Sequence, residues 1–160
     1  MEEKKKKIHP TGTVVIVIIL GAVLAIAYWL ISPLFFDKYS DESIEDIASE
    51  HDSVKILQEG SFVGVVGHEG GGTAQVLDIE GKNFVRFDDD FFVTNGPDLL
   101  VYLGRGNEYD PKARLGKLKG SKGAQNYAVP SGIKLKDYNS VWVFCRAFKV
   151  PFSHAQLRDL

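Results

Sequence analysis

The chain has 160 residues, of which 44% are hydrophobic, and a formal net charge of -2. This length predicts one globular core, and the charge distribution lacks the basic patch of a nucleic-acid-binding protein. The single cysteine, Cys145, excludes an intrachain disulfide. One cysteine and four histidines also exclude a structural zinc site of the usual spacing.

The first predicted element is an uncharged apolar helix over residues 13–31. Its 19 residues, at about 1.5 Å each, match the thickness of a membrane's hydrocarbon core. Four lysines precede it, and seven acids against one lysine follow it between residues 37 and 52. By the positive-inside rule, the N-terminus is cytoplasmic and the remainder is outside. We predict a basic cytoplasmic tip over residues 1–12 and a transmembrane anchor over residues 13–36.

A cleaved signal peptide is the alternative interpretation of this segment. Ala25-Ile26-Ala27 resembles a small-x-small cleavage site after a basic region. Against cleavage at Ala27, the apolar stretch continues to Phe36, where a signal peptide becomes polar. Both interpretations place the following domain outside the cytoplasm. With the transmembrane anchor, the domain stays attached to the membrane by a single-pass helix.

Residues 37–54 are predicted to form an acidic linker or a stalk helix. Ser43, followed three residues later by Asp46, resembles a capping box at the start of a short amphipathic turn. An acidic docking surface for a basic partner is the functional alternative, although most charge runs are solvated faces.

Residues 55–160 are predicted to form an all-β domain, either a β-sandwich or a barrel-like sheet. Short apolar runs alternate there with Gly, Asp, Asn and Pro. The turns at 68–72 and 80–83 are predicted hairpin connections. Segment 104–125, with six basic residues and five glycines, is predicted to be a surface loop whose cations and amides suit an anion. The predicted strands cover residues 62–66, 73–79, 84–87, 91–94, 99–103, 127–129, 141–144 and 150–152.

The chain contains no standard catalytic motif, and two features remain as candidate sites. Clustered acids suit a calcium ion, but their loop lacks EF-hand spacing and also reads as an ordinary turn. Cys145 ends an aromatic strand beside Arg146, and a nearby cation favours the reactive thiolate. Strand neighbours point to opposite faces, however, and free cysteines are commonly buried. The acids of the calcium hypothesis are Asp88, Asp89, Asp90 and Asp98.

His68 lies in the glycine-rich turn at 68–72. In such a turn a histidine is usually exposed or bonded to the local backbone. If the fold brings it towards Cys145, it is instead an axial ligand or a proton donor.

An ordered series of motifs runs from Gly60 to Leu160. This series resembles the DM13 domain family. The resemblance implies a β-rich extracytoplasmic module that takes part in electron transfer, with Cys145 in the position of the family's characteristic cysteine, its suspected redox group. Family members occur beside DOMON and cytochrome b561-type domains in animals and as membrane-anchored forms in prokaryotes. The motifs are Gly60-Ser61-Phe62, His68, Gly72-Thr73-Ala74, Phe84-Val85-Arg86-Phe87, Thr94-Asn95-Gly96-Pro97-Asp98-Leu99, Val101-Tyr102-Leu103, Leu115-Gly116-Lys117-Leu118-Lys119-Gly120, Gly123-Ala124-Gln125-Asn126-Tyr127 and the strand from Val141 to Cys145.

The resemblance leaves two mechanisms open for Cys145. As a thiol redox centre, it passes through a sulfenic acid or a mixed disulfide with another envelope or membrane redox protein, because its own chain has no second cysteine. As a cofactor ligand, its thiolate binds haem iron or another metal, although the sequence alone identifies no cofactor.

A different class of function is a non-catalytic interaction or adhesion module of the cell envelope, in which Cys145 only fills the core. The aromatic residues Trp142, Tyr102, Tyr109 and Tyr127 then form a binding patch, although on strands they are more often core.

Overall fold

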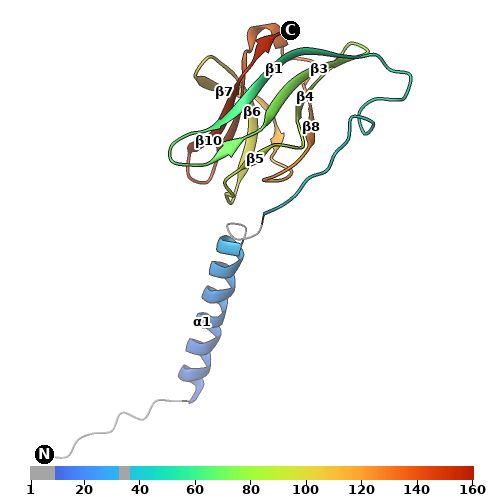
Figure 1. The fold of residues 1–160 in the computed structure, drawn as a ribbon. Helices are drawn as coiled ribbons and strands as arrows, with labels where there is room; N and C mark the ends of the chain where they lie inside the picture. Colours follow the sequence, from blue (N-terminus) through green and yellow to red (C-terminus); the bar gives the residue numbers. More distant parts are fainter. Residues whose placement is uncertain (1–9, 33–36) are drawn as a thin grey trace, which may run out of the picture.

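A computed structural model describes residues 10–32 and 37–160 of the chain. Its first element is helix α1 (Pro10–Ile31), whose 22 residues carry no charge and extend for about 33 Å. No part of Gly12–Trp29 is buried against the rest of the protein, and α1 projects away from the β domain (Figure 1). The helix is therefore long and apolar enough to cross a membrane, or to act as a signal anchor. The last part of the predicted anchor, 33–36, lies outside the described residues.

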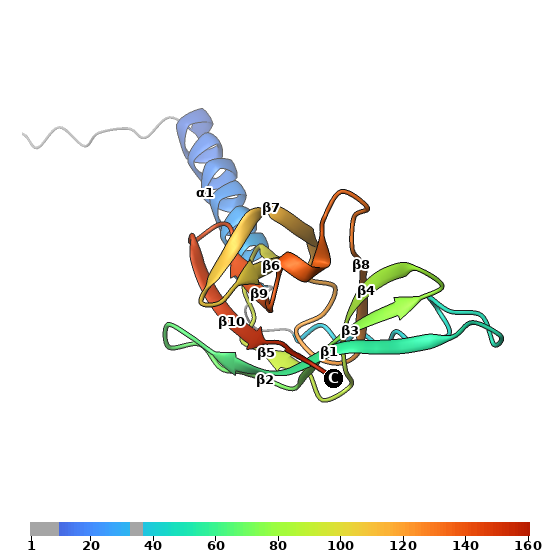
Figure 2. The same ribbon diagram turned by 90° about the horizontal axis from the view of Figure 1, so that it is seen from above.

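The β domain is built on one sheet of nine strands, in the order β7-β6-β9-β10-β1-β3-β4-β8 with β11 beside β1. The edge strands β7 and β8 approach each other, so the sheet nearly closes into a barrel (Figure 2). This arrangement confirms the prediction of an all-β, barrel-like domain. The strands are β1 (Val54–Gly64), β2 (Gly70–Gly71), β3 (Thr73–Ile79), β4 (Lys82–Phe87), β5 (Phe92–Val93), β6 (Leu99–Arg105), β7 (Glu108–Lys117), β8 (Gln125–Ala128), β9 (Ser140–Cys145), β10 (Val150–Gln156) and β11 (Arg158–Asp159), and a short 3-10 helix, η2 (Leu135–Asp137), precedes β9.

Aromatic side chains fill the barrel. The ring centroids of Phe62, Phe87 and Phe91 lie 4.7 to 4.9 Å apart, and Tyr127 of β8 packs against Phe87 at 5.2 Å. Each large side chain buried in this way contributes about 1.5–3 kcal/mol. The interior is consequently a packed core and not an open channel.

A second, smaller cluster covers the outer face of β6 and β9. Because successive strand residues point to opposite faces, Leu100 and Tyr102 lie outside while Val101 points inward, and all three are buried. Trp142 of β9 joins the outer cluster and stacks on His154 of β10, with centroids 4.4 Å apart.

Strand β7 is the main difference from the predicted strand pattern. It occupies 10 of the 22 residues of segment 104–125, which was predicted to be a surface loop. Pro111 obscures the strand in the sequence, but a proline is tolerated on an edge strand, where its missing N–H removes no ladder bond. The hairpin predicted at 80–83 is confirmed: Glu80 and Gly81 have φ values of 49° and 80°, as a two-residue type I′ turn between β3 and β4 requires.

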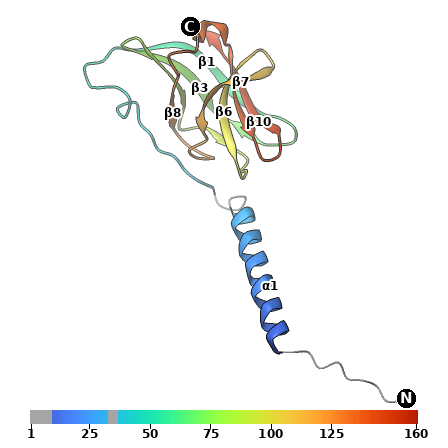
Figure 3. The same ribbon diagram turned by 180° about the vertical axis from the view of Figure 1, so that it is seen from behind.

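The segment before β1 packs along the barrel. We call residues 38–43 the strap. Ser40 N–H donates to the Lys122 carbonyl at 2.9 Å and Glu42 N–H to the Ala124 carbonyl at 3.1 Å. Ser43 N–H donates to the Asp46 carboxylate at 2.7 Å, as the capping-box pattern predicts. Only turns follow over residues 44–52, so this part of the predicted linker or stalk helix contains no α-helix, and the segment passes beside the barrel (Figure 3). The backbone groups of residues 38–42 thus bond to the barrel.

Candidate functional site

Cys145 is the last residue of β9, and its side chain is 0% exposed. Val143 and Val141, two and four residues earlier, are equally buried in the barrel core. The strand alternation therefore turns the sulfur inward. The residue lies in register with Leu99 of β6 and Val150 of β10. The only thiol of the chain is thus held between two apolar neighbours at the end of a strand.

Arg146, the cation next to the thiol in sequence, is engaged elsewhere. Its Nε donates to the Asp98 carboxylate at 2.6 Å, and its backbone N–H donates to the Asp98 carbonyl at 3.0 Å. The guanidinium is exposed and Cys145 is not. These contacts make Arg146 part of a surface ion pair, so they give no support to an Arg-stabilised thiolate.

His68 bonds to its own turn and also covers the core. Its N–H donates to the Val65 carbonyl at 3.0 Å. Its ring stacks on Phe152, with the ring centroids 3.6 Å apart and the planes at 15°. Phe152 belongs to the same core cluster as Cys145. The structure thus brings both predicted site residues to one end of the core but makes no hydrogen bond between their described atoms.

The described residues do not form a metal centre. They contain no group of three or more His, Cys, Asp or Glu side chains that could hold an ion. The acids of the calcium hypothesis separate into different contacts: Asp88 pairs with Arg86, Asp90 accepts from Thr73 and Asp98 pairs with Arg146.

Haem ligation by Cys145 also finds no room in this fold. A thiolate ligand needs an open face on which the iron and its macrocycle lie. The sulfur is fully buried, and the residues in register with it on the neighbouring strands, Leu99 and Val150, are apolar. The residues around it therefore do not fit the group.

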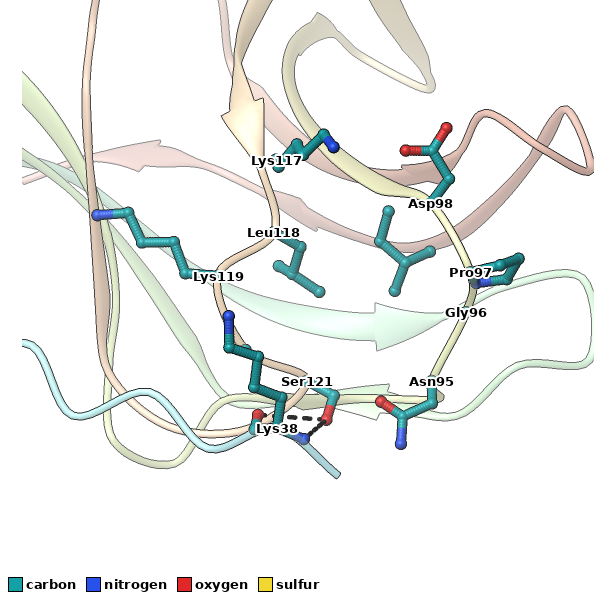
Figure 4. Close-up of a pocket in the computed structure, with 11 residues that line it drawn as sticks. Lys38, Asn95, Gly96, Pro97, Asp98, Lys117, Leu118, Lys119 and Ser121 are labelled. Atoms are coloured by element: carbon teal, nitrogen blue, oxygen red, sulfur yellow. Dashed lines mark hydrogen bonds between the residues drawn. The ribbon is translucent and has the colours of Figure 1, made fainter. Parts of the chain in front are cut away.

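A cleft of about 350 Å³ opens beside this end of the core (Figure 4). Its apolar floor includes Leu99, the residue opposite Cys145, and Leu118. Gly96 forms one wall, where an added Cβ would lie 2.9 Å from both the Leu99 and the Phe152 side chains. We call this site the lysine-rimmed cleft; its lining consists of Lys38, Asn95, Gly96, Pro97, Asp98, Leu99, Lys117, Leu118, Lys119, Gly120 and Ser121.

Two lysines give the rim of the cleft its charge. Lys38 and Lys117 are exposed, and neither has an ion-pair partner among the described residues. Lys119 points away from the cleft (Figure 4), with its Nζ 2.8 and 2.7 Å from the Glu42 carboxylate oxygens. The Lys119 and Gly120 amides donate to the Gln125 side chain at 3.1 and 3.2 Å. These two amides are therefore not free for the anion binding that was predicted for segment 104–125.

A family model described as Electron transfer DM13 matches residues 61–157. The chain belongs to the DM13 family. No curated protein and no solved structure matches the chain significantly. The family match indicates an electron-transfer-related module. The matched range contains Cys145, His68 and the whole cleft except Lys38.

The aromatic residues of the interaction hypothesis do not form an open patch in this DM13 domain. Tyr127 belongs to the barrel core. Tyr102 and Trp142 are only 8% and 6% exposed, because they pack on one another and on the half-buried Tyr109. Burial raises the pKa of the Tyr102 hydroxyl. These side chains act mainly as a second core.

Sequence reasoning missed the cleft of the DM13 domain. Leu99 and Gly96 belong to the Thr94–Leu99 motif that carries part of the family resemblance, which was the one available signal. Lys38 lies in the acidic segment before the domain, and no sequence signal pointed to it. Its place depends on the strap, whose position follows from long-range backbone bonds to residues 122–124.

Proposed function

We propose that this chain is a membrane-tethered, extracytoplasmic electron-transfer module in which Cys145 is the redox group. The family supports electron transfer. Helix α1 and the lysines before it support a tether with a cytoplasmic N-terminus. The observation that carries the role of Cys145 is its place: the only thiol ends a strand at the core end beside the cleft, one residue before an exposed turn.

The reaction fitting one thiol is relay between a donor dithiol and an acceptor disulfide in other membrane or envelope proteins. The Cys145 thiolate attacks the acceptor disulfide, forms a mixed disulfide, and the leaving thiolate takes up a proton. A donor thiolate then attacks the Cys145 sulfur, which releases the acceptor as a dithiol. The second donor thiolate closes the donor disulfide and frees Cys145. Two electrons and two protons have then moved from donor to acceptor.

The reaction requires a local opening, because exchange needs access to a sulfur that is 0% exposed. Residues 146–149 after Cys145 are all exposed, and Lys149 has a positive φ of 57°. Exposed turns with few buried contacts belong to the least stable parts of a fold. Fraying of this turn uncovers the sulfur without unfolding the barrel.

The second candidate is an interaction module in which Cys145 only fills the core. The complete burial of the sulfur and its apolar neighbours favour it. It shares the anchor and the fold with the redox module. The two differ in whether the thiol reacts in the folded protein.

Thiol labelling across a urea series separates these functions. The full chain, in nanodiscs, is treated with a maleimide at urea concentrations below the unfolding transition. For the redox module, the opening free energy derived from the labelling rate changes with urea by less than about a third of the global unfolding slope, since a local opening exposes little surface. Equal slopes would show that the thiol reacts only after global unfolding. That result would refute the redox module and support the interaction module, in which Cys145 only fills the core. Ala147→Cys in a Cys145→Ala background gives the reference rate of an exposed thiol.

Carbonate extraction tests the proposed tether independently. The full chain should remain in the membrane pellet, and its intact mass should include residues 1–27. Release into the supernatant, or a mature N-terminus after Ala27, would refute the anchor.

A further inference from the structure

We propose that the lysine-rimmed cleft docks on the headgroup of an anionic phospholipid in the membrane that α1 spans. The inference rests on the tether of the proposed function but not on the chemistry of Cys145. Lys38 and Lys117 reach the opening of the cleft from opposite ends (Figure 4), above a floor that includes Leu99 and Leu118. A cationic rim over an apolar floor is complementary to a phosphodiester carried on a glycerol backbone.

The charge of the cleft suits a phosphate. Asp98, the acid of the rim, is bound by Arg146 at 2.6 Å, and Lys119 is neutralised by Glu42 at 2.7 Å. Lys38 and Lys117 remain as the charges without a partner among the residues that the structure describes. Ammonium groups form charge-assisted hydrogen bonds to phosphate oxygens.

The position of the cleft places it close to the bilayer. Lys38 follows Ile31, the last residue of α1, by seven residues, and a chain of that length spans at most about 25 Å. The barrel end with the loop between β5 and β6 also lies towards α1 (Figures 1 and 3). Lys38 is thus held near the headgroups by the chain itself, in the range where an anionic surface attracts lysines.

The apolar floor favours a lipid over free phosphate. Free phosphate uses only the rim and is typically held by converging backbone amides. In this cleft the Lys119 and Gly120 amides already donate to Gln125. A lipid headgroup uses both the lysines and the floor that Leu99 and Leu118 supply.

Lysine footprinting of the full chain in nanodiscs tests the docking. Membrane insertion is first checked by carbonate extraction. A water-soluble acylating reagent is then applied to nanodiscs of phosphatidylcholine with or without phosphatidylglycerol, and each lysine is followed by mass spectrometry. Lys38 and Lys117 should react at least about fivefold more slowly with phosphatidylglycerol present. Lys134 and Lys136, which lie outside the cleft, serve as internal controls and should react equally in both.

A charge-neutral variant tests the coupling of the two lysines. Lys38→Gln should reduce the protection of Lys117 about fivefold, since each lysine contributes separately to the attraction, whereas Lys134→Gln should leave it unchanged. Equal rates in both lipids, with the protein inserted, would overturn the docking and leave the redox proposal intact. If inorganic phosphate protected both lysines equally well in phosphatidylcholine nanodiscs, the cleft would be a free-anion site, and the proposal of a lipid headgroup would be overturned. Failure of insertion would overturn the tether and this inference together.

Discussion

Replacing the Cys145 sulfur with a hydroxyl should destabilise the barrel more than removing the sulfur. Cys145→Ala loses about 1 kcal/mol of apolar burial and leaves a cavity of roughly 20 Å³ that costs about 0.5 kcal/mol more. Cys145→Ser loses the same packing and also buries a hydroxyl between Leu99 and Val150, at a further cost of about 1–3 kcal/mol if it stays unpaired. The expected losses are thus about 1.5 kcal/mol for Ala and about 2.5–4.5 kcal/mol for Ser.

Urea unfolding of the full chain in detergent measures these losses through the near-ultraviolet circular dichroism of the packed aromatic core. Cys145→Val, which keeps an apolar side chain of similar volume, is the matched control and should lie within about 1.5 kcal/mol of the parent. If Ser were as stable as Ala, position 145 would have a polar partner and the view of a dry, apolar sulfur site would be wrong. Otherwise Ala or Val, and not Ser, is the proper redox-inactive variant.

Three further changes test other parts of the fold. His154 has a buried Nδ1 without a partner among the described residues, and burial lowers the pKa of its ring. As the pH falls, the unfolded state therefore binds the proton before the folded state does. The unfolding free energy should consequently fall by at most about 1.4 kcal/mol per pH unit as the pH drops below about 6.5. His154→Phe should remove this loss in urea titrations at several pH values. Glu42→Gln should speed hydrogen exchange in the strap because it removes the ion pair with Lys119, and it should cost only about 1 kcal/mol because that pair is partly exposed. Glu50→Gln, at an exposed residue without an ion pair among the described residues, should change neither. Gly72→Ala should cost at least about 2 kcal/mol in urea unfolding, because φ is +100° and the new Cβ would lie 2.4 Å from a backbone atom, while Gly132→Ala, with open space around it, should be neutral.

The strands that were predicted well are those whose own residues carry the signal. Residues 73–79 form β3 with the predicted bounds, and the Glu80-Gly81 turn carries its backbone requirement in its residue types. In β7 the residue types and the strand pairing point to different structures. Pro111 and the charged residues argue for a loop, and only pairing with β6 makes the segment a strand. An edge strand of this kind is recognisable only once its partner is known.

The capping-box pattern at the end of the strap likewise predicts a local bond but not the structure that follows it. The pairing of Ser43 with Asp46 was readable from the sequence, and the predicted bond forms. Whether a helix follows depends on competition with the barrel. Glu42 accepts from Lys119 and from the Asn126 backbone at 2.9 Å, and these contacts connect residues more than seventy positions apart.

The sequence identified Cys145 as a candidate site residue, but it did not predict which residues surround it. The isolation of Cys145 as the only thiol and the strand that carries it follow from the sequence. Its pairing with Leu99 depends on the register of β9 against β6, which distant parts of the chain fix together. The cleft could not be predicted, because three separated segments meet there.

The strap determines how freely the domain moves on the proposed tether. Between Ile31 and Val54 lie 22 residues, which as a flexible linker would have a root-mean-square length of about 25 Å and a far longer reach. With the strap bound to residues 122–124, only residues 32–37 remain as a connection, and they span at most about 25 Å between Ile31 and Lys38. A short tether raises the effective concentration of the cleft at the membrane surface. If the proposed lipid docking holds, weakening the strap by Glu42→Gln should therefore reduce the lipid protection of Lys38 and Lys117 without changing either lysine.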